Sequence, residues 1–172
     1  MNTRGRVWIE GNHARSSVTT WVPLPAEKVF AYISDFSRHH EWARNEITVT
    51  PVTSAPVGLG SKYQSVGKQG GKEWPSDLEV TAYEPPHRFE FTAAGGPLDS
   101  PVGDPHRHEF LIRPENGGTS LELRRSDPKP PSMSTLVWRL FGYLVVSATL
   151  AWRIETVENL RVELERQKDS NS

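Results

Sequence analysis

Residues 136–167 read LVWRLFGYLVVSATLAWRIETVENLRVELERQ, a long tail interrupted by a single glycine, Gly142. Apolar or small side chains recur at steps of three and four from Leu136 to Leu164, which is the spacing of one helix face. The first half of this tail is apolar nearly all round, whereas charged residues form a solvated side in the second half. With Ser132 or Ser134 as its cap, we expect one helix that runs to about Gln167. Its apolar half must be covered on more than one side.

The middle of the chain has the opposite character. Of the 13 glycines and 14 prolines, 22 lie between Pro51 and Pro131. The segments between these turns favour strands, at a spacing of roughly eight to twelve residues that is typical of an antiparallel meander. The expected strands are Ile47–Val49, Ser61–Val66, Trp74–Tyr83, Arg88–Ala93, Arg107–Arg113 and Thr119–Ser126. A strongly curved sheet of this kind could wrap around the apolar helix.

The N-terminal part adds a further strand and two short helices. We expect residues 1–13 to be a flexible lead-in, followed by a β-branched strand over Ala14–Val22. Pro25 suits the first turn of a helix, and the apolar stripe that follows it ends at Phe36. A second short helix passes through Trp42, and we expect the pair His39-His40 on its surface.

Composition excludes several classes of protein. The absence of cysteine excludes disulfides, a thiolate nucleophile, an iron–sulfur cluster and cysteine-bound zinc. The net charge of −1 and the lack of a basic run with interleaved aromatics indicate no nucleic-acid partner. The uncharged stretch 140–152 is shorter than the roughly 20 residues of a membrane span, so we expect no stable membrane insertion. A cytoplasmic protein is the expectation.

Four local motifs, in this order, resemble those of the SRPBCC or START-like superfamily, of the polyketide cyclase/dehydrase and lipid-transport type. They are PAEKVFAYISDF at 25–36 followed by Glu41-Trp42, VGLGSKY at 57–63, VTAYEPPHRFEF at 80–91, and Gly117-Gly118-Thr119. The resemblance implies an α+β helix-grip fold, in which a curved antiparallel sheet wraps around a long C-terminal helix and two short helices follow the first strand. The single START-like domain would cover residues 14–167, followed by a disordered tail at 168–172, in a monomer or homodimer.

Strand alternation predicts which side chains face the interior, because neighbouring residues of a strand point to opposite sides. His106 and His108 share the apolar side of their strand with Phe110 and Ile112. Together with the helix face, alternation predicts a pocket for a hydrophobic or amphipathic ligand. The predicted pocket residues are Trp74, Leu78, Val80, Phe89, Phe91, His108, Phe110, Leu121, Leu123, Arg125, Tyr143 and Ser147.

Catalysis in such a pocket would depend on few groups. The candidates are His108 as an acid/base, with Arg125 or Tyr63 steadying an enolate oxygen. The pair His106-x-His108 has the spacing of two metal ligands, but the position for an acidic third ligand falls on Ile112 or Arg113. We therefore expect no metal site and no cofactor.

Three functions stay open at this point. The first is binding or carriage of a hydrophobic or amphipathic small molecule, such as a lipid, polyketide or isoprenoid. The second is a cyclase or dehydratase that acts on a polyketide-like chain, so the residues leave the question of enzyme or carrier unanswered. The third is a dimer face or a peripheral membrane contact formed by the apolar segment from Trp138 to Trp152.

Overall fold

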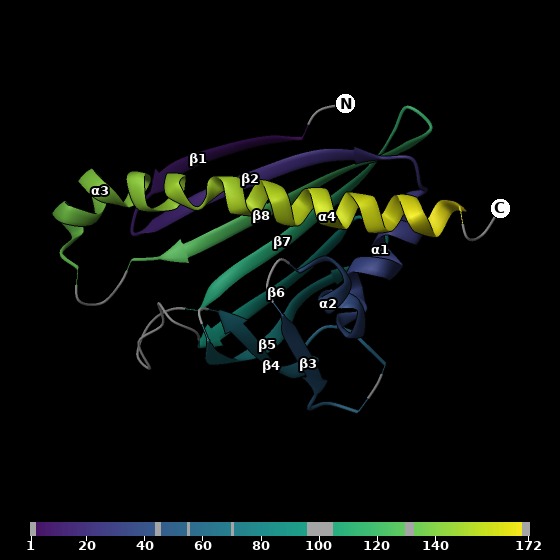
Figure 1. Cartoon of the computed structure of the whole chain (residues 1–172), viewed down its shortest axis with the longest axis horizontal. Coiled ribbons are helices and arrows are strands. Elements are labelled where there is room, and N and C mark those ends of the chain that lie inside the picture. Colours follow the sequence, from purple (N-terminus) through teal and green to yellow (C-terminus); the bar gives the residue numbers. More distant parts are fainter. Residues whose placement is uncertain are drawn as a thin grey trace.

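One curved antiparallel sheet of eight strands forms the body of the protein, and the C-terminal helices lie across it (Figure 1). The computed structural model describes residues 3–43, 46–54, 56–69, 71–95, 105–129 and 133–169. The strand order is β1-β2-β8-β7-β6-β5-β4-β3. Strands that follow one another in the chain are therefore neighbours in the sheet, except β2 and β3. β2 pairs with β8 instead, and β3 is at the opposite edge. The helix-grip fold expected from the sequence is confirmed.

The elements follow the expected order closely. The strands are β1 (Arg4–Glu10), β2 (His13–Val22), β3 (Ile47–Pro51), β4 (Lys62–Gln69), β5 (Lys72–Glu84), β6 (Arg88–Gly95), β7 (His106–Glu115) and β8 (Gly118–Pro128). The helices are α1 (Ala26–Ser34), the 3-10 turn η1 (Phe36–Arg38), α2 (His39–Trp42), α3 (Thr135–Ala148) and α4 (Leu150–Asp169). Of the tail expected at 168–172, α4 includes the first two residues, and 170–172 lie outside the described residues.

The first strand corrects one expectation. Residues 4–10, expected in a flexible lead-in, form β1, which pairs antiparallel with β2 through a tight turn. Gly11 in this turn has a φ of 61°, a conformation that glycine adopts without a Cβ clash. Because β1 is an edge strand with several exposed polar side chains, its sequence lacks the clear alternation of a half-buried strand.

The C-terminal helix is not continuous. It breaks at Thr149 into α3 and α4, whose axes differ by 41°. At the break, the backbone N–H of Thr149 bonds the Val146 carbonyl, and its hydroxyl donates to the same carbonyl oxygen at 2.8 Å. Such local bonding by a threonine competes with regular helix bonding. Within the described part of the chain, no helix alone is long and apolar enough to cross a membrane, although α3 and α4 meet that test as a bent pair.

The main core lies between α1, η1, α2, the second half of α4 and the concave face of the sheet. Phe36 is its centre, with ring centroids 4.3 Å from Tyr63, 5.1 Å from Phe91 and 5.7 Å from Phe89. His39 also belongs to this core, 4.4 Å from Phe36, so the expectation of a surface position was wrong for His39. His40, its neighbour on α2, is exposed. On α4, Leu160 and Leu164 complete the core from the other side.

Candidate functional site

A group of charged side chains lies on the concave face where β8 ends and β7 begins. Asp127 is at its centre, and its Oδ1 accepts hydrogen bonds from His106 Nδ1 at 2.8 Å and Arg125 Nε at 2.6 Å. Its Oδ2 accepts from an Nη of Arg153 at 2.6 Å. The other Nη of Arg153 donates to the hydroxyl of Ser16 on β2. We call these five residues the ionic cluster.

Three elements bring the ionic cluster together. On β8, alternation places Arg125 and Asp127 on the concave side, and β2 presents Ser16 to the same side. On β7, alternation does the same for His106 and His108. Arg153 comes from the first turn of α4 and is buried. The cluster therefore ties the helix to the sheet across the α3–α4 break.

The charges of the cluster hold one another in their ionised forms. Burial would raise the pKa of Asp127, but Arg125, the hydrogen bond from His106 and the charge of Arg153 together lower it below its ordinary value. Burial lowers the pKa of the Arg153 guanidinium, and Asp127 opposes that change. Two guanidinium groups face one carboxylate, so the cluster carries an excess of positive charge.

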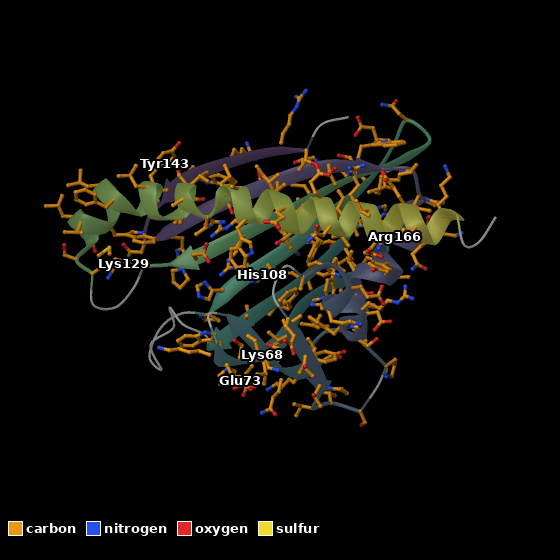
Figure 2. All side chains as sticks on the ribbon, in the orientation of Figure 1. Lys68, Glu73, His108, Lys129, Tyr143 and Arg166 are labelled. Carbon is orange, nitrogen blue, oxygen red and sulfur yellow. The ribbon has the colours of Figure 1, made fainter. Side chains whose placement is uncertain are left out.

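His108 lies beside this cluster, next to Arg125 in the register of β7 and β8. Figure 2 shows His108 near the start of β7, where β8 ends. Its ring stacks on Phe91, with centroids 4.8 Å apart and planes inclined by 5°. Burial, followed by the charge of Arg125, lowers the pKa of His108 well below its ordinary value, so the imidazole is neutral at pH 7.

The structure divides the predicted pocket residues into three groups. Six of them are buried in the main core: Leu78, Val80, Phe89, Phe91, Phe110 and Leu121. Four are half-buried on the concave face: Trp74, His108, Leu123 and Arg125. The last two are on α3, where Ser147 is half-buried and Tyr143 is half exposed and points away from His108 (Figure 2). The half-buried group on the sheet is the part that can contact a ligand.

Tyr63 is separated from the other two catalytic candidates. Its ring contacts Phe36, which in turn contacts Phe91, and His108 stacks on Phe91. Tyr63 instead lines an open pocket of about 430 Å³ between η1 and residues 49–54 and 56–57. Burial and the charge of Asp35 raise the pKa of the Tyr63 phenol, which keeps it protonated. The structure therefore brings His108 and Arg125 together, without Tyr63.

Sequence reasoning missed Asp127, Arg153 and Ser16. Asp127 continues the inward alternation of β8 two residues beyond Arg125, which could have identified it. Arg153 is a charge within an otherwise apolar stretch of the helix, the pattern of a buried and paired residue. In the described ranges, no group of three or more His, Asp or Glu side chains is arranged to hold a metal ion.

Solved structures share the fold at low sequence identity. A protein of unknown function from Staphylococcus aureus, SA2116, has a TM-score of 0.71 and 15% identity, covering 93% of this chain and 98% of that one. A protein from Arthrobacter aurescens has a TM-score of 0.68 and 13% identity, covering 94% and 91%. For a protein from Rhodobacter sphaeroides the TM-score is 0.67 and the identity 18%, covering 94% of this chain and 97% of that one. At such identities the likeness shows the fold alone.

Sequence comparisons then identify the family. No match is found among curated protein sequences. The family model described as polyketide cyclase / dehydrase and lipid transport matches residues 13–165, which is nearly all of the sheet and both C-terminal helices. The chain therefore belongs to the polyketide cyclase/dehydrase and lipid transport family.

Proposed function

We propose that the domain binds an amphipathic small organic molecule on the concave face, with the ligand's polar end at Arg125 and His108. Membership of the polyketide cyclase/dehydrase and lipid transport family supports a fold that binds hydrophobic ligands. The observation that carries the proposal is the unused hydrogen-bonding capacity of two neighbouring side chains on the concave face.

Arg125 supplies most of this capacity. Its Nε donates to Asp127, which fixes the guanidinium in place. Its terminal nitrogens have no hydrogen-bond partner among the residues that the structure describes, and 22% of the side chain is exposed. A guanidinium held by one edge presents a planar pair of donors to a carboxylate or carbonyl oxygen. The excess positive charge of the ionic cluster favours an anionic group there.

His108 supplies the second polar contact. Within the described ranges, neither ring nitrogen has a hydrogen-bond partner, and the side chain is only half-buried. Its stacking on Phe91 fixes the plane of the ring. Since the imidazole is neutral, one nitrogen donates and the other accepts. A ligand with adjacent donor and acceptor oxygens, such as a hydroxy acid, matches this pair.

Apolar side chains surround the polar pair. Ala93, which pairs with His106, and Leu123, two residues before Arg125 on β8, are half-buried on the same face, whereas Phe91 and Phe110 next to them are buried in the core. The concave face therefore changes at His108 from a filled aromatic core to half-buried side chains beside the ionic cluster. An apolar ligand body lying here would remove Ala93 and Leu123 from water, which favours binding by roughly 25 cal/mol per Å² of buried apolar area.

A direct test is binding of anilinonaphthalene sulfonate, a fluorescent probe with an apolar body and one anionic group. We expect the protein to bind it saturably, and Arg125→Gln to weaken binding by about tenfold, the effect of losing a charge-assisted contact. The matched control is Arg124→Gln, at the preceding residue of β8 and on the opposite face of the sheet, where Arg124 pairs with Glu122. Melting temperatures of both variants would be measured alongside.

Two results would contradict this proposal. One is equal probe affinity for Arg125→Gln and the parent protein while Arg125→Gln stays folded. The other is an equal loss of affinity in Arg124→Gln, which would place the probe on the convex face. Native mass spectrometry of the freshly purified protein adds an independent readout, since a carrier is expected to retain a co-purified ligand that dissociates on denaturation.

A specific observation favours an enzyme as the second candidate function. The neutral imidazole of His108 can accept the α-proton of a carbonyl compound, and the guanidinium of Arg125 beside it can stabilise the enolate oxygen that forms. The test is hydrogen–deuterium exchange at the α-carbon of an acetoacetyl thioester, followed by NMR. An enzyme is expected to accelerate exchange, and His108→Phe to abolish the acceleration. Exchange at the buffer rate with the parent protein would exclude this activity.

A further inference from the structure

Helix α3 has an exposed apolar surface that the proposed ligand site does not use. Nine large apolar side chains are exposed in the described residues, and six of them are on this one helix: Leu136, Val137, Leu140, Phe141, Tyr143 and Leu144. The other three, Val52, Leu59 and Val162, are separate from one another in the chain. Scattered apolar residues are ordinary on a protein surface, but a contiguous group of this size indicates a binding surface.

The helix is held to the domain by its opposite side. Trp138 and Val146 are buried and pack with Ala14 of β2, and Val7 and Ile9 of β1 complete this contact. Successive residues of a helix turn by about 100°, so Leu136, Leu140 and Leu144 lie along one side that is directed away from Trp138 and Val146. In Figure 1, α3 lies at one end of the molecule.

The charges in this part of the sequence have one sign. From Lys129 to Ile154 the chain contains Lys129, Arg139 and Arg153 and no acidic residue, although the whole protein has a net charge of −1. Arg153 is buried, whereas Arg139 is exposed on α3. On the helix, Arg139 and Tyr143 lie at the edge of the leucine stripe, between the exposed side and the buried side. An apolar stripe with an arginine and a tyrosine at its edge is the arrangement of a helix that lies in a lipid–water interface.

We propose that the exposed surface of α3 docks on an anionic lipid bilayer, with the leucine stripe among the acyl chains and Arg139 at the phosphate groups. This contact would be peripheral, since α3 alone is too short and too firmly packed on β1 and β2 to span a bilayer. A second copy of the chain is a poorer occupant. Two such surfaces facing each other would bring two arginines together, with no acid on either α3 to pair with them.

Docking in this way has a consequence for the ligand site. The buried side of α3 packs on Ala14, which pairs with Asp127 in the register of β2 and β8. The lipid-facing helix is therefore one layer away from the ionic cluster and its neighbour His108. A lipid-derived ligand could pass between bilayer and domain at this end of the sheet without crossing open water.

Flotation with vesicles of phosphatidylcholine, with and without phosphatidylserine, tests the proposal on the full chain. We expect the protein to float with the vesicles that contain phosphatidylserine, less with phosphatidylcholine alone, and less at high salt. Leu140→Glu is expected to reduce the fraction bound by about tenfold or more. The matched control is Leu59→Glu, in the loop before β4, because Leu59 is 74% exposed and Leu140 is 62% exposed.

Each further outcome bears on the proposal directly. Equal flotation of the parent protein and Leu140→Glu would overturn it, as would no flotation of the parent protein. Size-exclusion chromatography with light scattering measures the competing occupant. A dimer that Leu140→Glu converts to a monomer would show that α3 binds a second copy instead. Arg125→Gln, which tests the ligand site, is expected to float like the parent protein, so the two proposals can fail separately.

Discussion

The two ends of the concave face are built by different means. Under α1, η1 and α2, aromatic rings fill the space, and Phe36 contacts four other rings there. Under the α3–α4 break, hydrogen-bonded charges around Asp127 join the helix to β8 and β2. A filled aromatic core stabilises the fold and leaves little room for a ligand. A buried charge cluster stabilises little on balance, but it fixes the positions of polar groups, which is what recognition requires.

The largest expected effect is at the charged end. Asp127→Ala leaves two arginines and a histidine without their common acceptor, so the free energy of unfolding is expected to fall by about 3–5 kcal/mol. Urea denaturation measures it. Glu163→Ala, which removes a partner of the exposed Arg166 on α4, is the control and is expected to cost less than about 1 kcal/mol.

A double variant tests whether the loss of stability in Asp127→Ala comes from the unpaired charge of Arg153. If the cost comes from orphaned charge, Asp127→Ala combined with Arg153→Met should lose less stability than the sum of the two single changes. Additive losses would show that Asp127 and Arg153 do not act as a pair, and the description of the charged end as one cluster would then be wrong.

The second prediction concerns pH at the aromatic end. Burial lowers the pKa of His39 to about 4, against about 6.5 in the unfolded chain. Above pH 6.5 neither state is protonated at this group, whereas between pH 6.5 and 4 only the unfolded chain takes up the proton. The free energy of unfolding therefore decreases as the pH falls through this window, by about 3 kcal/mol from His39 alone.

His39→Phe tests this effect, because phenylalanine keeps the contacts with Phe36, Trp42 and Phe91 and removes the titrating group. The variant should lose less stability between pH 6.5 and 4 than the parent protein does. His40→Phe, at the exposed neighbour on α2, is the control. An unchanged pH dependence in His39→Phe would show that His39 is not buried in solution.

The two ends also differ in how well the sequence predicts them. At the aromatic end, the period of two along β5 and β6 correctly places Leu78, Phe89 and Phe91 inside, because strand alternation is a local property. At the charged end, the bond between Asp127 and Arg153 depends on how the helix crosses the sheet. That crossing depends on the break at Thr149, a local departure from a helix that the apolar pattern alone would continue to Leu164.

Periodicity also does not predict which face of the last helix is exposed to solvent. The pattern of the last helix predicts a face containing Leu136, Leu140 and Tyr143, and it does not say whether anything covers that face. In the structure, β1 pairs with β2 and packs against the opposite side of α3, which leaves this face open. Because the sequence pattern does not predict β1, it also gives no sign that Tyr143 lies outside the pocket.

A third, smaller effect tests how tightly the aromatic end is filled. Phe36→Leu replaces the ring at the centre of the core by a smaller apolar side chain, so the loss of stability is expected to be about 1–2 kcal/mol. The variant opens space next to Phe91, and binding of anilinonaphthalene sulfonate measures whether a ligand can use it. A loss of less than about 0.5 kcal/mol would mean that the core is loosely packed around Phe36.

The smallest expected effect is at the boundary between the two ends. His108 has no hydrogen-bond partner in the part of the chain that the structure describes, so His108→Phe removes no internal polar contact and keeps the stacking on Phe91. Its cost in stability should be below about 1 kcal/mol at pH 7, and because it removes a base whose pKa is lowered in the folded state, the variant should tolerate acid better than the parent protein. Thermal melts at pH 7 and pH 5 measure both. A larger loss at pH 7 would mean that His108 belongs to the structural part of the cluster, as His106 does through its bond to Asp127. A small loss combined with weaker probe binding would separate the residue that recognises a ligand from the charges that hold it in position.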